Sequence, residues 1–485
     1  MLALPILLPL LGAFICFVCN RAARWIAVVT CLALLLAVLD LASSVDGNTL
    51  SQFAGGWTPP LGIGLYADGL SVLLLCLTAI VGLAISIYAT AYFEHHADNA
   101  AARVFWPLWL LLLGGINALF LTADVFNLYV TLELMGLVAV ALVTLEAKAI
   151  AAALRYLLVG LLGSMLYLLG VGLLYAQYAT VDMQLLAQLI VSDHPATKSA
   201  VALMSAGLIM KAALFPLHFW LPPAHASAPA PVSAALSALV VKAAFYAVAR
   251  LWIGPFAEVI SAQAGLLLAL LGAAAILWGS LQALLAARLK LVVAYSTVAQ
   301  LGYLFLMFAF IGHGEALRIA WYGGIWLALS HGLAKAGLFL AAGSLMHASG
   351  HDRVSDLAGA GQHLPITLFA IGLASASLMG LPPSGGFIGK WFLLNAAFTS
   401  GQWWWALVLL GGGVLTAAYT FRVLLHAFRN RDGAHHYHPA PALMEWSALA
   451  LALGAVALGI WSAVPLGVLE SGAPLGPFLL SQGAP

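Results

Sequence analysis

Long runs of apolar residues dominate the chain, and each run is close to the length that crosses a bilayer. A helix of about 20 apolar residues spans the hydrocarbon core of a membrane. Such runs lie at 3–19, 24–42, 69–92, 105–122, 124–145, 152–177, 200–221, 232–253, 264–286, 289–311, 317–346, 366–398, 403–428 and 445–468. The pattern therefore predicts an all-α membrane protein with about fourteen transmembrane helices.

Proline interrupts two of these runs. The seventh contains MKAALFPLHFWLPPAHASAPAPVSA and the twelfth contains MGLPPSGGFIGKWF. Because proline lacks an amide donor and clashes with the preceding turn, each break exposes carbonyl groups that lipid cannot satisfy. The breaks fall five runs apart, which predicts two inverted five-helix repeats, a pattern typical of transporters. The expected units are three N-terminal helices (1–104), a first repeat (105–253), a second, inverted repeat (254–428), and a loop with the last helix (429–485).

Composition and charge agree with a membrane protein. Hydrophobic residues make up 64% of the 485 residues and charged residues 7%, too little polarity to cover a water-soluble globule. Of the 18 Lys and Arg residues, four lie inside the predicted spans and three lie on one side of them: Lys198, Arg250 and Arg318. The other eleven, which include Lys290 and Arg353, lie on the opposite side. Because cytoplasmic loops are rich in Lys and Arg, both termini are predicted on the periplasmic side of a bacterial inner membrane.

The charged residues inside the spans are the main candidates for function. They are Lys211, Lys242, Lys335 and Lys390, with Glu133 near the middle of the fifth span. A charged side chain at the bilayer centre costs roughly 2.5–3.5 kcal/mol on insertion scales, so these residues predict a proton pathway. Glu133 and Lys211 are expected to form an ion pair, with a structural clamp between helices as the competing interpretation. For Lys390 the competing interpretation is snorkelling to the interface.

Three histidines extend the predicted pathway. His331 precedes Lys335 by four residues, so the two share a helix face. A histidine side chain, with an unperturbed pKa of about 6.5, can both accept and donate a proton, which predicts a relay beside the lysine. An ordinary hydrogen-bonded histidine is the alternative. His218 and His225 flank the first break and predict a proton inlet.

Cofactor motifs are missing from the sequence. No GxGxxG follows a strand pattern, no GxxxxGK[ST] occurs, and the four cysteines do not have the spacing of a cluster site. Cys16 and Cys19 form a CxxC within an apolar helix, where packing is the favoured interpretation. We therefore expect no bound cofactor, no metal and no nucleic acid partner.

The same segments resemble a known family. The chain is similar to the antiporter-like membrane subunits shared by respiratory complex I (NADH-quinone oxidoreductase subunits L, M and N), membrane-bound hydrogenases and Mrp cation/proton antiporters. The resemblance runs from YADGLSVLL, through KAALFPLHFWLPPAHASAPAPVSAALSALVVKAAFYAVAR and SHGLAKAGLFLAAGSL, to LPPSGGFIGKWFL. The segment TADVFNLYVTLE looks most like the D-type member of the Mrp antiporters.

The resemblance implies a proton-translocating, or cation/proton antiporting, subunit that works with other membrane subunits. By residue, it implies a coupled pair in a first half-channel (Glu133, Lys211), a cytoplasmic-side acceptor (Lys242), a central axis (His331, Lys335) and a terminal site toward the outer face (Lys390). Leu327 stands where some relatives carry a further histidine, which shortens the expected central axis.

Several points stay open at this stage. They are whether Na⁺ accompanies H⁺, which complex hosts the chain, and whether that complex is an enzyme. A hydrogenase or a carbon-uptake complex is the alternative host. An enzymatic host would be similar to NADH:quinone oxidoreductase, with no redox cofactor in this chain.

Overall fold

The computed structural model describes residues 1–45, 48–94, 99–190, 194–429 and 437–471. Its first half contains the helices α1 (Leu4–Val18), α2 (Ala23–Ser44), α3 (Gly69–Glu94), α4 (Asn99–Leu121), α5 (Val125–Val143), α6 (Ile150–Tyr178), α7 (Met183–Leu189), α8 (Pro195–Lys211), α9 (Leu221–Ser227), α10 (Ala230–Ala235) and α11 (Val241–Ile253). Its second half contains α12 (Ala262–Leu285), α13 (Leu289–Phe305), α14 (Gly314–Ser349), α15 (Ala360–His363), α16 (Pro365–Met379), α17 (Gly385–Thr399), α18 (Trp404–Ala427), α19 (Ala442–Ile460) and α20 (Ala463–Glu470).

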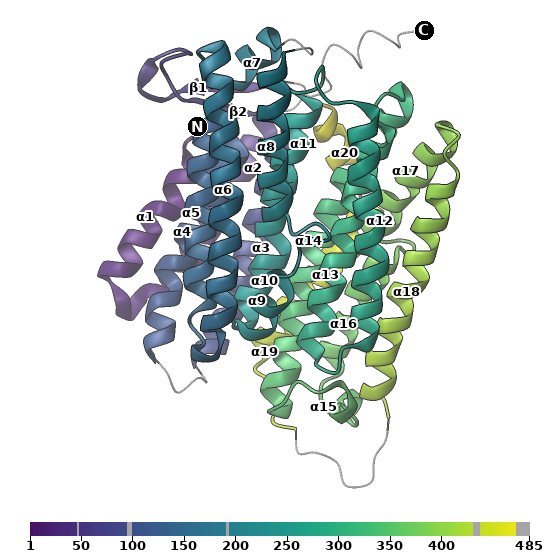
Figure 1. Cartoon of the computed structure of the whole chain (residues 1–485). Coiled ribbons are helices and arrows are strands. Elements are labelled where there is room, and N and C mark those ends of the chain that lie inside the picture. The colour runs from purple at the N-terminus through teal and green to yellow at the C-terminus, as the bar shows by residue number, and fades with distance from the viewer. Residues whose placement is uncertain (46–47, 95–98, 191–193, 430–436, 472–485) are drawn as a thin grey trace.

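These helices form a bundle in which most connections lie at the two ends (Figure 1). In the described part of the chain, eleven helices are long and apolar enough to cross a membrane, and α1 and α16 are shorter apolar helices. The helical membrane fold is therefore confirmed, while the number of fourteen crossings stays a prediction. The N-terminus lies at the same end of the bundle as α20, with which the described chain closes (Figure 1).

A short β-hairpin interrupts the all-α pattern. Strands β1 (Leu50–Phe53) and β2 (Gly64–Ala67) pair antiparallel, with Leu50 opposite Ala67 and Phe53 opposite Gly64. Each strand has only 4 residues, and the connection between α2 and α3 is rich in glycine and proline, so the sequence shows no clear alternating pattern there and predicts no strand. Figure 1 places the hairpin at one end of the bundle, beside α7.

Both predicted breaks are present. Helix α8 ends at Lys211 and α9 begins at Leu221, while α16 ends at Met379 and α17 begins at Gly385. Gly380 ends α16 in the left-handed region, at φ 86°, a conformation that glycine adopts without a steric penalty. The assignment of 105–253 and 254–428 as inverted repeats stays a prediction.

Glycine allows two helix pairs to approach at backbone distance. A Cβ on Gly207 of α8 would lie 2.2 Å from the carbonyl oxygen of Gly163 in α6. A Cβ on Gly302 of α13 would lie 2.3 Å from the carbonyl oxygen of Gly272 in α12. Such close contacts replace the hydrophobic driving force that is missing between helices in lipid. They fix α8 and α13, the two helices on which the functional site depends.

A buried ion pair fastens the end of α11 to the start of α3. Arg250 donates to both carboxylate oxygens of Asp68, with 2.8 Å between Nη2 and Oδ1, and also to the hydroxyl of Ser71. Asp68 is fully buried and accepts from the backbone N–H of Ser71 at 2.9 Å, so it also caps α3. Tyr246 completes the cluster, because it accepts from Arg250 Nε and donates to the carbonyl of Phe120.

We expect Asp68→Ala to lower the free energy of unfolding by about 3–5 kcal/mol, because it leaves the Arg250 charge buried and unpaired. Unfolding of the purified protein in mixed micelles measures the change. Glu315→Ala is the control, since its pair with Arg318 is about half exposed (51% and 56% of the two side chains). An exposed pair contributes about 0–1 kcal/mol. Equal losses in the two variants would contradict a stabilising role for the buried pair.

Candidate functional site

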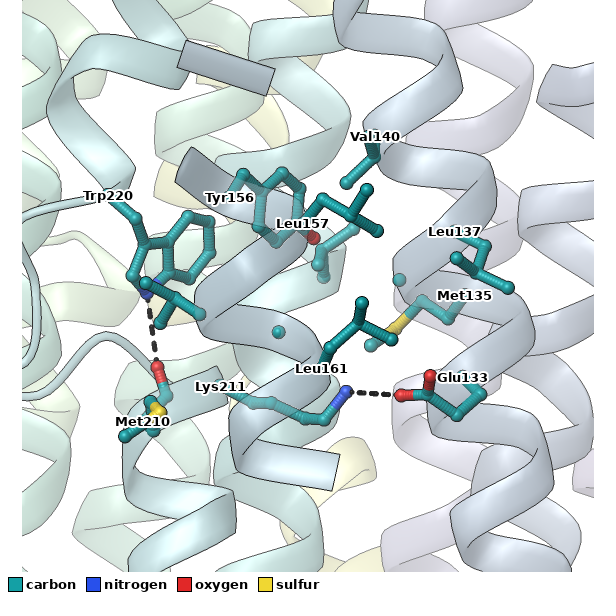
Figure 2. Close-up of a pocket in the computed structure, with 14 residues that line it drawn as sticks. Glu133, Met135, Leu137, Val140, Tyr156, Leu157, Leu161, Met210, Lys211 and Trp220 are labelled. Atoms are coloured by element: carbon teal, nitrogen blue, oxygen red, sulfur yellow. Dashed lines mark hydrogen bonds and ion pairs between the residues drawn. The ribbon is translucent and has the colours of Figure 1, made fainter. Parts of the chain in front are cut away.

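Glu133 and Lys211 meet inside the first half of the bundle. The Nζ atom of Lys211 lies 3.0 Å from Oε1 of Glu133, and the Ser164 hydroxyl donates to the same oxygen. The side chain of Lys211 is 7% exposed and that of Glu133 is 18% exposed, so little water screens the pair. Figure 2 shows Lys211 reaching from the end of α8 toward Glu133 on α5. Because α8 ends at the first break, its last residue, Lys211, lies where its side chain reaches the Glu133 carboxylate.

A small cavity adjoins this pair (Figure 2). Its volume is about 20 Å³, and Tyr156, Trp220 and Val240 contribute to its walls. This is room for one water molecule beside two charged groups that can hold it. The Trp220 ring stacks on Tyr156 with 4.2 Å between ring centroids, and its Nε1 donates to the carbonyl of Met210 at 3.1 Å. Trp220 therefore satisfies a carbonyl group at the C-terminal end of α8 and also lines the cavity.

Lys242, the next predicted lysine along the chain, lies on α11. It is completely buried and donates to the carbonyl oxygen of Ser237. Ser237 belongs to a π-helical turn, Leu236–Val240, that joins α10 to α11. A π-turn shifts the backbone hydrogen bonds by one residue, which makes a carbonyl accessible to a side chain. The Ser237 hydroxyl lies 2.9 Å from that of Thr297 on α13.

Lys335 of α14 binds the same region of α13. Its Nζ donates to the carbonyl of Val293 at 3.0 Å and to the Ser296 hydroxyl. Thr297, which contacts Ser237, also donates to the Val293 carbonyl at 3.1 Å. One turn of α13 therefore joins Lys335 to the group that holds Lys242.

Lys390 lies at the second break. Its Nζ donates to the carbonyl oxygens of Leu378 at 2.9 Å and Met379 at 3.0 Å, the last two residues of α16. The negative end of the α16 dipole favours a cation there. The ammonium also lies 4.2 Å from the centroid of the Tyr303 ring, within cation–π range. Lys390 thus points inward to the break, and snorkelling does not describe its position.

Gln300 links Lys390 to the centre. Its Nε2 donates to the carbonyl of Leu378 at 3.1 Å, the same oxygen that Lys390 binds. Gln300 lies on α13, one turn beyond Ser296 and Thr297. Helix α13 consequently carries polar contacts to three of the four predicted lysines, or to the groups that hold them.

Two of the predicted histidines lie among these lysines. His331 is 3% exposed, and His225 is fully buried. Within the described residues, neither ring has a hydrogen-bond partner for its nitrogens. The charges of Lys242, Lys335 and Lys390 act on His331, and those of Lys242, Lys290 and Lys335 act on His225. Among the described residues, no hydrogen bond holds either ring, so both stay candidates for the predicted proton pathway.

His218 is placed differently. It lies in the first break, where its ring stacks on Phe215 with 5.4 Å between centroids. In the part of the chain that the structure describes, no hydrogen bond or ion pair joins it to the lysines. Leu327 packs beside Gly389, next to Lys390 in the chain. An apolar side chain therefore fills this space, where a polar one would lie between Lys390 and the predicted central axis.

Several polar residues at the site were not predicted. They are Ser164, Ser237, Lys290, Ser296, Thr297 and Gln300. Four of these lie on α13: Lys290, Ser296, Thr297 and Gln300. Their spacing places them on one face of the helix. This polar stripe in an apolar helix is the signal that could have identified them. Among the described residues, no group of three or more His, Cys, Asp or Glu side chains could hold a metal ion.

Comparison with known proteins gives consistent matches across the chain. Residues 122–416 match the family described as NADH:quinone oxidoreductase/Mrp antiporter, TM, and residues 58–105 match the N-terminus of complex I chain 5. The chain is 36% identical to NADH-quinone oxidoreductase subunit N of Desulforudis audaxviator, over 95% of this chain and 96% of that one. It is 29% identical to the D-type member of the Na(+)/H(+) antiporter of Alkalihalophilus pseudofirmus, over 88% and 86%.

A solved structure agrees with these sequence matches. A chain of the Mrp complex from Dietzia sp. DQ12-45-1b superposes with a TM-score of 0.88 and 26% identity, covering 99% of this chain and 98% of that one. The structural similarity therefore extends over nearly the whole chain.

The second break supplies a test of this geometry. A Cβ on Gly386 would lie 1.8 Å from the carbonyl oxygen of Ser377. Gly386→Ala must therefore push α17 away from α16, and we expect a loss of about 1–3 kcal/mol in the free energy of unfolding. Gly372→Ala, in α16 with no atom within 4 Å of the new Cβ, is the matched control. Its expected change is a gain of up to about 1 kcal/mol. Similar unfolding curves for both variants would refute the close packing at the break.

Proposed function

Since the chain belongs to the family of NADH:quinone oxidoreductase and Mrp antiporter transmembrane subunits, we propose that it moves protons through a membrane as one subunit of a multisubunit complex. The path, called here the relay, consists of Glu133, Lys211, Lys242, His331, Lys335 and Lys390. Relatives named as parts of an Mrp antiporter and of NADH-quinone oxidoreductase support this role.

One observation carries the proposal. A single helix, α13, contacts Lys335 and the groups that hold Lys242 and Lys390. Amines inside an apolar bundle carry a large desolvation cost, which the oxygen atoms that they bind offset only in part. A connected series of titratable groups does explain them.

The three amines outside the ion pair, Lys242, Lys335 and Lys390, are bound by uncharged oxygen atoms, which tolerates a change of protonation. Lys390 donates two N–H groups to two carbonyl oxygens. A neutral amine still has two N–H donors, so loss of the third proton leaves both bonds in place. Glu133 and Lys211 behave differently, because neutralising either group removes their attraction. We infer that transport is driven by a neighbouring protein that weakens or strengthens this pair.

The chemistry of the relay favours H⁺ as the cargo. Four amines bind protons, whereas Na⁺ requires oxygen ligands and is repelled by ammonium groups. Sodium exchange, which the name of one relative includes, would then depend on groups outside this relay.

Replacing Glu133 by Gln, or Lys390 by Met, should abolish coupled proton movement while the complex still assembles. Glu133→Gln removes the charge that Lys211 needs, and Lys390→Met removes the amine at the second break. Proton uptake into vesicles that contain the native complex, followed by a pH-sensitive dye, measures the effect. Glu315→Gln, at an exposed pair, should retain full uptake. Normal uptake in the Glu133 and Lys390 variants would remove the basis of the relay.

We further propose a bacterial inner membrane, with both termini in the periplasm. The predicted excess of Lys and Arg at one end of the spans supports this orientation. Cysteines placed at Arg353 and Arg318 test it, because the proposal puts Arg353 in the cytoplasm and Arg318 outside. In intact cells, an impermeant thiol reagent should label the Arg318→Cys variant alone. Labelling of Arg353→Cys from outside would reverse the orientation.

A further inference from the structure

A polar cavity opens beside the α5–α6 connection, at the end of the bundle opposite the β-hairpin, whose strand β2 bridges to Thr122 just before α5. Its volume is about 400 Å³, and it lies where the α5–α6 connection, the start of α13 and the end of α14 meet. Five charged side chains contribute to its walls: Glu146, Lys148, Arg288, Lys290 and Asp352. A polar space of this size is filled by water.

Two of its cations are ordinary surface charges. The side chain of Lys148 is 69% exposed and lies 3.6 Å from Glu146. That of Arg288 is 45% exposed and lies 2.5 Å from Asp352. Each of these cations has its own carboxylate at the rim, so neither needs a role in transport.

Lys290 differs from both. It is only 4% exposed, and its Nζ donates to the carbonyl oxygen of Ala228. Ala228 precedes Pro229 in the gap between α9 and α10, and it also lines the cavity. Lys290 therefore forms the floor of the cavity, where water at the rim meets the apolar interior.

Lys290 is connected inward to His225. The Ser233 hydroxyl lies 3.5 Å from the Ala228 carbonyl that Lys290 binds and 2.9 Å from the His225 carbonyl. The charge of Lys290 acts on the His225 ring, which stacks on Phe339 at 4.7 Å. The nitrogens of this fully buried ring have no hydrogen-bond partner among the described residues.

Lys290 also adjoins the relay along α13. Val293, whose carbonyl binds Lys335, follows Lys290 by three residues and so lies one turn further along the helix. The cavity, Lys290, His225 and Lys335 thus form a series that runs from water to the centre of the bundle.

We propose that Lys290 is the group through which the relay exchanges protons with water at this end of the bundle. This inference rests on the proposed function. A hydronium ion in the cavity protonates the neutral Lys290 amine and leaves a water molecule. The ammonium then passes its proton through intervening water to a ring nitrogen of His225 and returns to the neutral amine. Protons leave by the same steps in reverse.

A purely structural role, in which Lys290 only neutralises the Ala228 carbonyl, makes a different prediction. Lys290→Arg keeps the positive charge and the donor groups, but an arginine does not release its proton in a protein. In the native complex in vesicles, we expect Lys290→Arg to lower coupled proton flux at least about tenfold. Wild-type flux in this variant would overturn the proposal and favour the structural role.

Chemical rescue sharpens the test. Lys290→Cys, in a background whose four native cysteines are replaced by alanine, should show a similar loss of flux. A methanethiosulfonate that attaches an aminoethyl group restores an amine and should restore flux, but only when added from the side onto which the cavity opens. A sulfonatoethyl reagent of similar size should not. Rescue by both reagents, or failure of the cysteine to react, would overturn the proposal.

Two further variants separate the possible failures. Lys198→Cys, exposed at the opposite end of the bundle at the start of α8, should react only from the other side and keep normal flux. Glu133→Gln, measured in the same vesicles, tests the relay itself. If Glu133→Gln abolishes flux and Lys290→Arg does not, the role proposed for Lys290 is wrong and the proposed function stands. If Glu133→Gln retains flux, the proposed function fails.

Discussion

The carbonyl groups that helix breaks expose inside the membrane are the constraint on which this site depends. Each unsatisfied carbonyl in hydrocarbon costs several kcal/mol, so a break survives only where donors reach it. Here lysine amines are those donors: Lys242 binds Ser237 at the π-turn, Lys290 binds Ala228, and Lys390 binds Leu378 and Met379. The same contact lowers the cost of burying the amine, because a carbonyl dipole replaces lost hydration. Break and lysine therefore stabilise each other.

The same kind of contact explains why α13 is central. It is held against α12 at glycine contacts and presents one polar face to the lysines, or the groups that hold them, on three other helices. A rigid helix fixes distances between relay groups better than loops do. Small movements of α11, α14 or α17 against α13 would then make or break single contacts, which is how a conformational change could control proton passage.

The groups that carry charge were predictable from the sequence, but the groups that hold them were not. Proline pairs and buried lysines are visible in any apolar run, so both breaks and all four intramembrane lysines could be identified. The acceptor carbonyls could not, because they depend on where each helix ends and which helix packs beside it: Lys335 binds a carbonyl 42 residues away. The π-turn at Leu236–Val240 lies in a largely apolar stretch without a turn residue. Arg250 and Lys290 were counted as flanking charges, since their burial follows from tertiary packing with Asp68 and Ala228.

The two halves of the relay are electrostatically unequal, and this inequality suggests its direction of control. Lys211 has a carboxylate partner, whereas the partners of Lys390 among the described residues are carbonyl oxygens and the Tyr303 ring. Two unit charges about 10 Å apart interact by roughly 1.7 kcal/mol at an effective dielectric constant of about 20, so protonated lysines along the axis oppose one another. Separating Glu133 from Lys211 would expose an additional positive charge and disfavour protonation of the next amine. A change at the pair would thus be passed toward Lys390 without any carboxylate at the second break.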